Sequence, residues 1–413
     1  MTPALLSLGT ALPPHVLEQT DALELYRDQQ GTDRLNTRLL GTVFGAAGVA
    51  RRHTVLAELV DDDARGDSPF IAPDGQFRSP LTGVRNRAYV AHAPALFAAA
   101  ARDALARCPG LDPASVTDVI TVSCTGFFAP GPDYKVVRAM DLKPSVQRYH
   151  LGFMGCYAAF PALRSAKAFC EADPDAVVLV ISAELCSLHV RSSNNPDTIV
   201  GSSLFADGAA AAIISARDLP LDGPALTLDH FETVLTPVGE ESMAWNIGDE
   251  GFEMVLGTYV PHIIDEHIVG ALEPLLARDA SLQGLDYAEI EHWAIHPGGR
   301  SILDKVEAKL GLSKQQLVPA RETLRDYGNM SSATVMFVLK NILEKPASDG
   351  NDRICSMAFG PGLTVETALL TRIGATRSDA GTGTAADDAA VGRAPGDADV
   401  PAELEPILTQ AGA

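Results

Sequence analysis

Cys156 is the first residue in the chain whose surroundings could support covalent chemistry. It follows Gly152 and Gly155 and precedes an apolar helical pattern that continues to Cys170. A cysteine at the start of a helix lies near unpaired backbone N–H groups, whose partial positive charge favours the thiolate. The glycines permit a tight turn and close approach of a substrate. This context predicts a nucleophile, although a buried structural cysteine has the same local pattern.

Two further motifs supply a histidine and an amide. His296 ends a short apolar run and is followed by Pro-Gly-Gly, and strand ends are where α/β sheets present reactive side chains. Such a histidine can pair with a thiolate or donate a hydrogen bond to a carbonyl oxygen. Asn329 follows a glycine before a helical pattern, and its neutral amide can stabilise an enolate. Taken alone, His296 is equally well explained as a histidine packed in the core, and Asn329 as an ordinary helix cap.

These side chains need elements that bring them together, and the sequence predicts an alternation of strands and helices. Expected strands span residues 5–12, 119–124, 176–182, 208–215, 293–296 and 353–359, and expected helices span residues 93–107, 158–170, 259–276, 301–310 and 331–344. Alternation of this kind predicts an α/β protein with largely parallel sheets. A break in the pattern near residues 216–227 predicts two halves, each with its own sheet.

The expected domain boundaries follow from this break and from a change in composition near the C-terminus. We expect an N-terminal half at residues 1–222, a C-terminal half at residues 223–373 and an acidic tail at residues 374–413. The tail is rich in Ala, Gly, Asp, Pro and Thr, and it contains seven acidic residues and two arginines. Such a composition buries too little apolar area to offset the entropy of ordering, so we expect the tail to be disordered.

Composition and charge exclude several classes of function. The net charge of −21 argues against a nucleic-acid partner, because binding phosphates requires a basic surface. No apolar run is long enough for a membrane span, and no basic segment precedes a long apolar run at the N-terminus, so we expect a cytoplasmic protein. The six cysteines show no C-x-x-C spacing, so the sequence predicts neither a disulfide framework nor a metal site.

Taken in order, the three motifs resemble those of type III polyketide synthases, the chalcone and stilbene synthase family. The resemblance is carried by Gly-Phe-Met-Gly-Cys156, Ile-His296-Pro-Gly-Gly and Tyr-Gly-Asn329-Met-Ser-Ser-Ala, and residues 204–210 and 360–367 are similar to two further signatures. It covers residues 5–372. It implies the thiolase fold, in which two related α/β halves form five αβαβα layers, and a homodimer.

The resemblance also implies a mechanism. Cys156 would take the acyl group of a starter acyl-CoA, with its thiolate kept ionised by His296. His296 and Asn329 would then bind the thioester carbonyl of malonyl-CoA while it loses carbon dioxide, and the carbanion would extend the chain on Cys156. Repeated rounds would end in a pyrone or a resorcinol-type product. No cofactor is expected, because CoA thioesters are the only co-substrates.

The resemblance further assigns a substrate pocket and CoA contacts. Phe205 matches an aromatic gatekeeper of the plant enzymes, Met254 replaces a second one, and Trp245 stands where the plant enzymes have a glycine. Ala129 replaces a methionine that reaches across the plant dimer. The other expected pocket residues are Cys124, Thr125, Cys186, His189, Gly360 and Pro361. The expected CoA contacts are Arg51, Arg52, Gly298, Gly299, Arg300 and Ser301.

Two alternatives remain at this point. A ketoacyl-acyl carrier protein synthase of the initiating type would use the same three residues for a single condensation onto a carrier protein. A catalytically silent homologue would serve as a scaffold, although such proteins generally lose a catalytic residue. The stretches around Cys124 and Cys186 look more like bacterial members of the family, which often take fatty acyl-CoA starters.

Overall fold

The computed structural model describes residues 2–219, 223–257, 259–346 and 352–374. The acidic tail expected at residues 374–413 lies outside these residues except for Gly374. No helix in the described ranges combines the length and the apolar character needed to cross a membrane.

Nine strands form one mixed sheet in the order β11-β12-β13-β8-β1-β7-β6-β4-β5. In chain order these are β1 (Ala4–Ala11), β4 (Asp118–Ser123), β5 (Gln147–Gly152), β6 (Val177–Leu185), β7 (Asp207–Ser215), β8 (Ala225–Leu235), β11 (His292–Ile295), β12 (Arg353–Gly360) and β13 (Thr364–Ile373). Only β4–β5, β4–β6 and β11–β12 pair in parallel. The expectation of largely parallel sheets is therefore wrong.

Strand β7 shows why the sequence misleads about strand direction. Its run Asp-Gly-Ala-Ala-Ala-Ala-Ile-Ile-Ser is buried at every residue, a pattern typical of parallel strands covered on both faces. It nevertheless pairs antiparallel with both β1 and β6. Burial on both faces comes here from helices packed on each side of the sheet, and this packing does not depend on strand direction.

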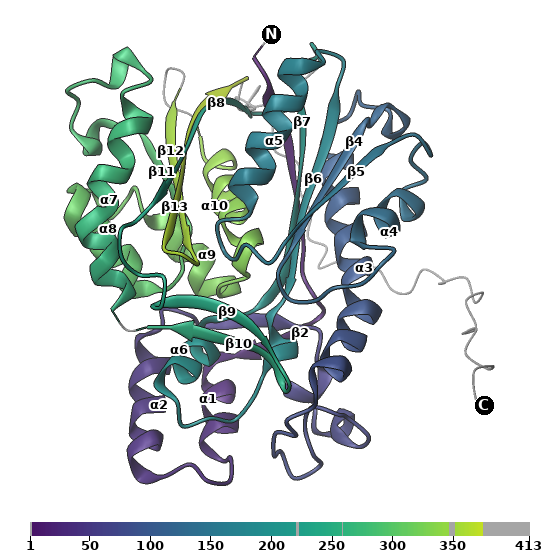
Figure 1. The fold of residues 1–413 in the computed structure, drawn as a ribbon, viewed down its shortest axis with the longest axis vertical. Coiled ribbons are helices and arrows are strands. Elements are labelled where there is room, and N and C mark those ends of the chain that lie inside the picture. The colour runs from purple at the N-terminus through teal and green to yellow at the C-terminus, as the bar shows by residue number, and fades with distance from the viewer. Residues whose placement is uncertain (1, 220–222, 258, 347–351, 375–413) are drawn as a thin grey trace, which may run out of the picture. The chain divides into compact units, whose positions relative to one another are not determined.

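Helices pack between two layers of strands and also cover the outer face of each layer. The main helices are α3 (Thr82–Ala106), α4 (Pro132–Ala139), α5 (Ala159–Ala172), α7 (Val260–Leu276), α8 (Arg300–Leu310), α9 (Val318–Tyr327) and α10 (Thr334–Leu343). Helix α5 contacts β4, β6 and β7 as well as β8 and β13, and α10 contacts β11, β7 and β1. Figure 1 shows α5 and α10 between the two groups of strands, with α3 and α4 outside one group and α7 and α8 outside the other.

This order of layers is the five-layer αβαβα arrangement that the resemblance implies. The two layers of strands are not separate sheets, however. Strand β1 pairs with β8 through Ala4–Thr227 and Leu5–Leu226, so a short hydrogen-bonded junction joins the strands of both layers. Sequence periodicity could not reveal this junction, because it depends on a pairing between residues more than two hundred positions apart.

A smaller group of elements lies at one end of the layers, at the bottom of Figure 1. It consists of β2 (His15–Glu18), α1 (Gln19–Arg27), α2 (Arg34–Ala46), β3 (Arg51–Thr54), α6 (Pro196–Leu204), β9 (Met243–Gly248) and β10 (Gly251–Leu256). The pairs β2–β3 and β9–β10 are two-stranded antiparallel ribbons. These elements help to enclose the cavity described next.

Candidate active site

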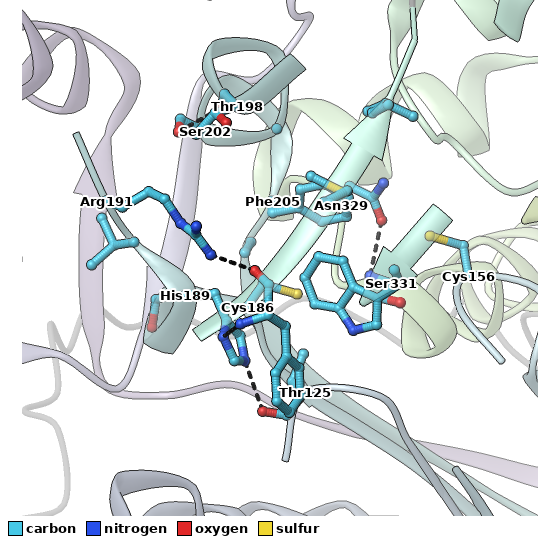
Figure 2. Close-up of a pocket in the computed structure, with 18 of the residues that line it drawn as sticks. Thr125, Cys156, Cys186, His189, Arg191, Thr198, Ser202, Phe205, Asn329 and Ser331 are labelled. Atoms are coloured by element: carbon cyan, nitrogen blue, oxygen red, sulfur yellow. Dashed lines mark hydrogen bonds between the residues drawn. The ribbon is translucent and has the colours of Figure 1, made fainter. Parts of the chain in front are cut away.

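A cavity of about 550 Å³ brings Cys156, His296 and Asn329 together. Many of the residues expected in the pocket also line it, namely Cys124, Thr125, Cys186, His189, Phe205, Trp245, Met254 and Pro361, together with Gly298. Figure 2 shows Cys156 on one side, with Asn329, Ser331 and Phe205 beside it. Gly360 does not line the cavity. A Cβ at Gly360 would lie 2.3 Å from Cδ1 of Tyr157, so Gly360 leaves room for that ring instead.

Cys156 lies in the turn between β5 and α5, and the helix begins at Ala159. Gly155 makes this turn with φ of +85°, and a Cβ there would lie 2.6 Å from Cδ of Pro361. Both features require a glycine. Burial raises the pKa of the Cys156 thiol to about 11, and a hydrogen bond from Ser331 offsets only part of this. Desolvation therefore opposes the resting thiolate that the helix start favours.

His296 is the first residue after β11. Its backbone N–H donates to the carbonyl oxygen of Met357 at 2.8 Å, and only 1% of its surface is exposed. Neither ring nitrogen has a hydrogen-bond partner among the described residues. Burial lowers the pKa of His296 to about 3, so the imidazole is neutral at pH 7 and offers one N–H donor and one nitrogen acceptor.

Asn329 is held by its backbone and oriented by its side-chain oxygen. Its N–H donates to Leu204 O, and Ala206 N–H donates to its carbonyl oxygen, both at 2.9 Å. The side-chain Oδ1 accepts a hydrogen bond from Ser331 N–H at 2.9 Å, so the amide group cannot turn freely. Nδ2 makes a long contact of 3.5 Å to Gly298 O, and a hydrogen bond from the Asn329 side chain helps to lower the pKa of the Cys156 thiol. The NH₂ group is therefore within reach of a ligand at Cys156.

Glu184, near the end of β6, is a site residue that the sequence did not single out. It is fully buried and accepts hydrogen bonds from Ser332 Oγ at 2.5 Å, Cys124 N at 2.9 Å and Thr125 Oγ1 at 2.9 Å. Burial raises the pKa of its carboxyl group. The sequence signal for Glu184 was a lone carboxylate inside the apolar run of a strand. A buried carboxylate needs a network of hydrogen-bond donors, and such a network marks a site.

Another part of the cavity lining is a rigid wall built from His189, Trp245 and Phe252. His189 Nε2 donates to Thr125 O at 2.9 Å, and Nδ1 accepts from Phe252 N–H at 3.1 Å. Its ring stacks on Phe252 with centroids 4.3 Å apart. Trp245 Nε1 donates to Cys124 O at 2.9 Å. Every polar ring atom of this wall is therefore already bonded to protein, and the indole is fixed across the cavity.

The residues expected to contact CoA phosphates separate into two groups. Arg52 is 6% exposed, and its guanidinium donates to the carbonyl oxygens of residues 202, 203 and 205 and to Gln19. Arg52 thus holds α6 in place while it also lines the cavity, and its contact with CoA stays a prediction. Arg51 and Arg300 lie on the exposed surface near Asp326 and Asp304 respectively. Gly299 and Ser301 flank Arg300 at the start of α8, outside the cavity lining.

Comparison with known proteins places this site in a family. Residues 2–218 match the family model for the N-terminal domain of chalcone and stilbene synthases, and residues 228–374 match the model for the C-terminal domain.

Two solved structures resemble the chain over most of its length. The C-terminal type III polyketide synthase domain of Steely1, a type I/III hybrid from Dictyostelium, is 26% identical with a TM-score of 0.81, over 90% of this chain and 99% of that chain. PKS-I from the brown alga Ectocarpus siliculosus is 28% identical with a TM-score of 0.83, over 90% of this chain and 98% of that chain.

Proposed function

The chain belongs to the chalcone and stilbene synthase family and is a type III polyketide synthase, and we propose that it assembles its product on Cys156 from an acyl-CoA starter and malonyl-CoA. One observation carries this proposal. Neither ring nitrogen of His296 has a partner among the described residues, the amide NH₂ group of Asn329 lies within hydrogen-bonding reach of the Cys156 thiol, and all three residues line the same cavity.

Loading of the starter requires a proton acceptor, because burial keeps the Cys156 thiol protonated. The neutral imidazole of His296 takes this proton as sulfur attacks the thioester carbonyl of the starter. The carbon–sulfur bond to CoA then breaks, and the imidazolium returns the proton to the departing CoA thiolate. His296 is neutral again at the end of the step, and the acyl group is a thioester of Cys156.

Extension uses His296 and Asn329 as neutral donors. Malonyl-CoA binds with its thioester oxygen near the His296 N–H and the Asn329 NH₂ group. When its carboxylate leaves as carbon dioxide, the electron pair moves onto this oxygen, and two preoriented donors stabilise the enolate. The enolate carbon attacks the Cys156 thioester and releases the Cys156 sulfur. Phe205 and Met254 line this region and supply an apolar surface beside the departing carboxylate.

The lengthened chain returns to Cys156 for further rounds and is released as a pyrone or a resorcinol-type product. The proposed steps use CoA thioesters only, without a metal ion or a redox cofactor. We further propose that the enzyme acts as a homodimer in the cytoplasm.

The proposal is tested by incubating the protein with malonyl-CoA and a panel of starter acyl-CoAs and identifying the products by mass spectrometry. We expect products that contain one starter and more than one malonyl-derived two-carbon unit. A product with a single added unit, formed only when malonyl-acyl carrier protein replaces malonyl-CoA, would establish the single-condensation alternative instead. Absence of carbon dioxide release with every starter would point to a silent scaffold.

A further inference from the structure

Arg191 extends into the cavity from the side opposite to Cys156 (Figure 2). It lies in the segment that connects β6 to α6, and its NH2 nitrogen donates to Phe252 O at 2.5 Å. Phe252 in turn is bonded to and stacked on His189, so the guanidinium is attached to the rigid wall. Of its five N–H donors, one is used among the described residues, and the remaining donors are available for a ligand.

A second arginine lies close to the first. Arg85 is 1% exposed, and its guanidinium donates to the carbonyl oxygens of Pro80, Leu188 and Val190, while its NH2 nitrogen has no partner among the described residues. The charge of Arg191 helps to lower the pKa of Arg85, after desolvation. In the described ranges, neither arginine has a carboxylate at ion-pair distance. Two neighbouring cations in this state favour the binding of an anion.

Two acids, Glu250 and Glu253, also line the cavity, and both are exposed. Glu250 is the one whose charge acts on Arg85. Its charge raises the pKa of Arg85 without forming an ion pair. Several polar residues that follow Arg191 in the chain also line the cavity, namely Ser193, Asn195, Thr198 and Ser202. A fully aliphatic chain end would leave the half-buried guanidinium of Arg191 without an anionic partner, whereas a charged chain end would use its remaining donors.

The chemistry of chain growth determines which part of the substrate reaches Arg191. Each extension inserts two carbons at the thioester end, so the terminal group of the starter moves away from Cys156. The group that meets Arg191 is therefore the end of the starter, and a planar carboxylate matches the guanidinium geometry. We propose that Arg191 binds a carboxylate at the distal end of the starter, so that this enzyme takes dicarboxylic acyl-CoA starters. This inference rests on the proposed function.

The test compares pairs of starters of equal length that end in a carboxylate or a methyl group: succinyl- and butanoyl-CoA, glutaryl- and pentanoyl-CoA, and adipoyl- and hexanoyl-CoA. The quantity measured is the ratio of kcat/KM within each pair for acylation of Cys156. For the length that reaches Arg191, we expect Arg191→Gln to lower this ratio about 10- to 100-fold, the usual value of a charged hydrogen bond. Arg191→Lys should retain part of the preference.

Two variants serve as controls. Arg107→Gln removes an equal charge from the exposed end of α3 and should leave the ratio unchanged. Glu250→Gln removes the competing negative charge and should raise the ratio. The Glu250 variant also keeps the proposal testable if Arg191→Gln fails to fold, which its thermal unfolding would show. An unchanged ratio in both the Arg191 and the Glu250 variants would overturn the proposal.

A CoA phosphate is the other anion that could meet Arg191. Acyl-N-acetylcysteamine thioesters lack these phosphates, and the carboxylate preference should persist with them. Loss of the preference with these thioesters, together with an equal rise in KM for every CoA substrate, would assign Arg191 to CoA and contradict the proposal. If no starter acylates wild-type Cys156, the proposed function itself has failed, whatever the Arg191 variants show.

Discussion

His189 and His296 line the same cavity and differ in what surrounds their ring nitrogens. Burial lowers the pKa of both His189 and His296 to about 3, so both are neutral at pH 7. His189 has both nitrogens bonded to backbone groups and its ring stacked on Phe252. His296 has neither nitrogen bonded within the described residues. The difference indicates that residue type and burial do not identify a reactive histidine, whereas unused hydrogen-bonding capacity does.

The largest expected effect follows from exchanging each histidine for glutamine. His296→Gln should slow decarboxylation of malonyl-CoA by about 10²–10⁴-fold, because it replaces the preoriented N–H donor to the enolate oxygen. The factor by which His189→Gln slows decarboxylation should be at least ten times smaller, since His189 only holds the wall of the cavity in place. The measurement is release of labelled carbon dioxide by folded protein. Equal losses in the two variants would remove the distinction between the two histidines.

The next effect concerns the ionisation of Cys156. Because burial raises its pKa to about 11, the thiolate fraction should increase about tenfold per pH unit between pH 7 and 10. The rate of alkylation by iodoacetamide, followed by intact mass, should rise accordingly. If the rate levels off below pH 8, Cys156 rests as a thiolate paired with His296. His296→Gln provides the control. The pH dependence of alkylation in this variant would shift to higher pH only if His296 stabilises the Cys156 thiolate.

The smallest effect concerns stability. Because the folded pKa of His189 lies below its unfolded value, the unfolded chain binds the extra proton, and stability is lost as the pH falls below about 6.5. Between pH 6.5 and 5 this amounts to about 2 kcal/mol for one histidine. His189→Gln should reduce the pH dependence of the unfolding free energy by this amount, as measured by urea denaturation. His262→Gln, on the exposed surface of α7, is the matched control, and an identical reduction there would contradict this assignment.

The sequence identified the residues that meet in the cavity because each stands in a short local motif. Glycines before Cys156, the Pro-Gly-Gly after His296 and the glycine before Asn329 all mark turns at the ends of elements. The sequence did not show what Glu184 or Arg191 does, because their contacts are with neighbours that are distant in the chain. The structural role of Arg52 was not visible in the sequence for the same reason, since only the fold shows that its guanidinium donates to carbonyl oxygens at the end of α6.

For the fold as well, the sequence predicted the features that depend on one element and not those that depend on pairing between elements. Apolar runs located most of the buried strands, including β4, β6 and β7, since burial depends on composition within one element. Strand direction and the junction between β1 and β8 depend on pairing partners, which periodicity does not encode. Helix α3 begins at Thr82, whereas the sequence predicted its start at residue 93. The prediction missed the first turns because they are polar and because Pro94 lies inside the helix.

The central claim is that Cys156, alone among the six cysteines, carries the growing chain. The most direct test is the intact mass of the wild-type protein after brief exposure to a starter acyl-CoA, followed by peptide mapping. We predict a mass increase of one acyl group, located on Cys156 and absent from Cys156→Ala, with Cys186→Ala still acylated. Acylation of Cys156→Ala at Cys124 or Cys186 to the wild-type extent would contradict the account.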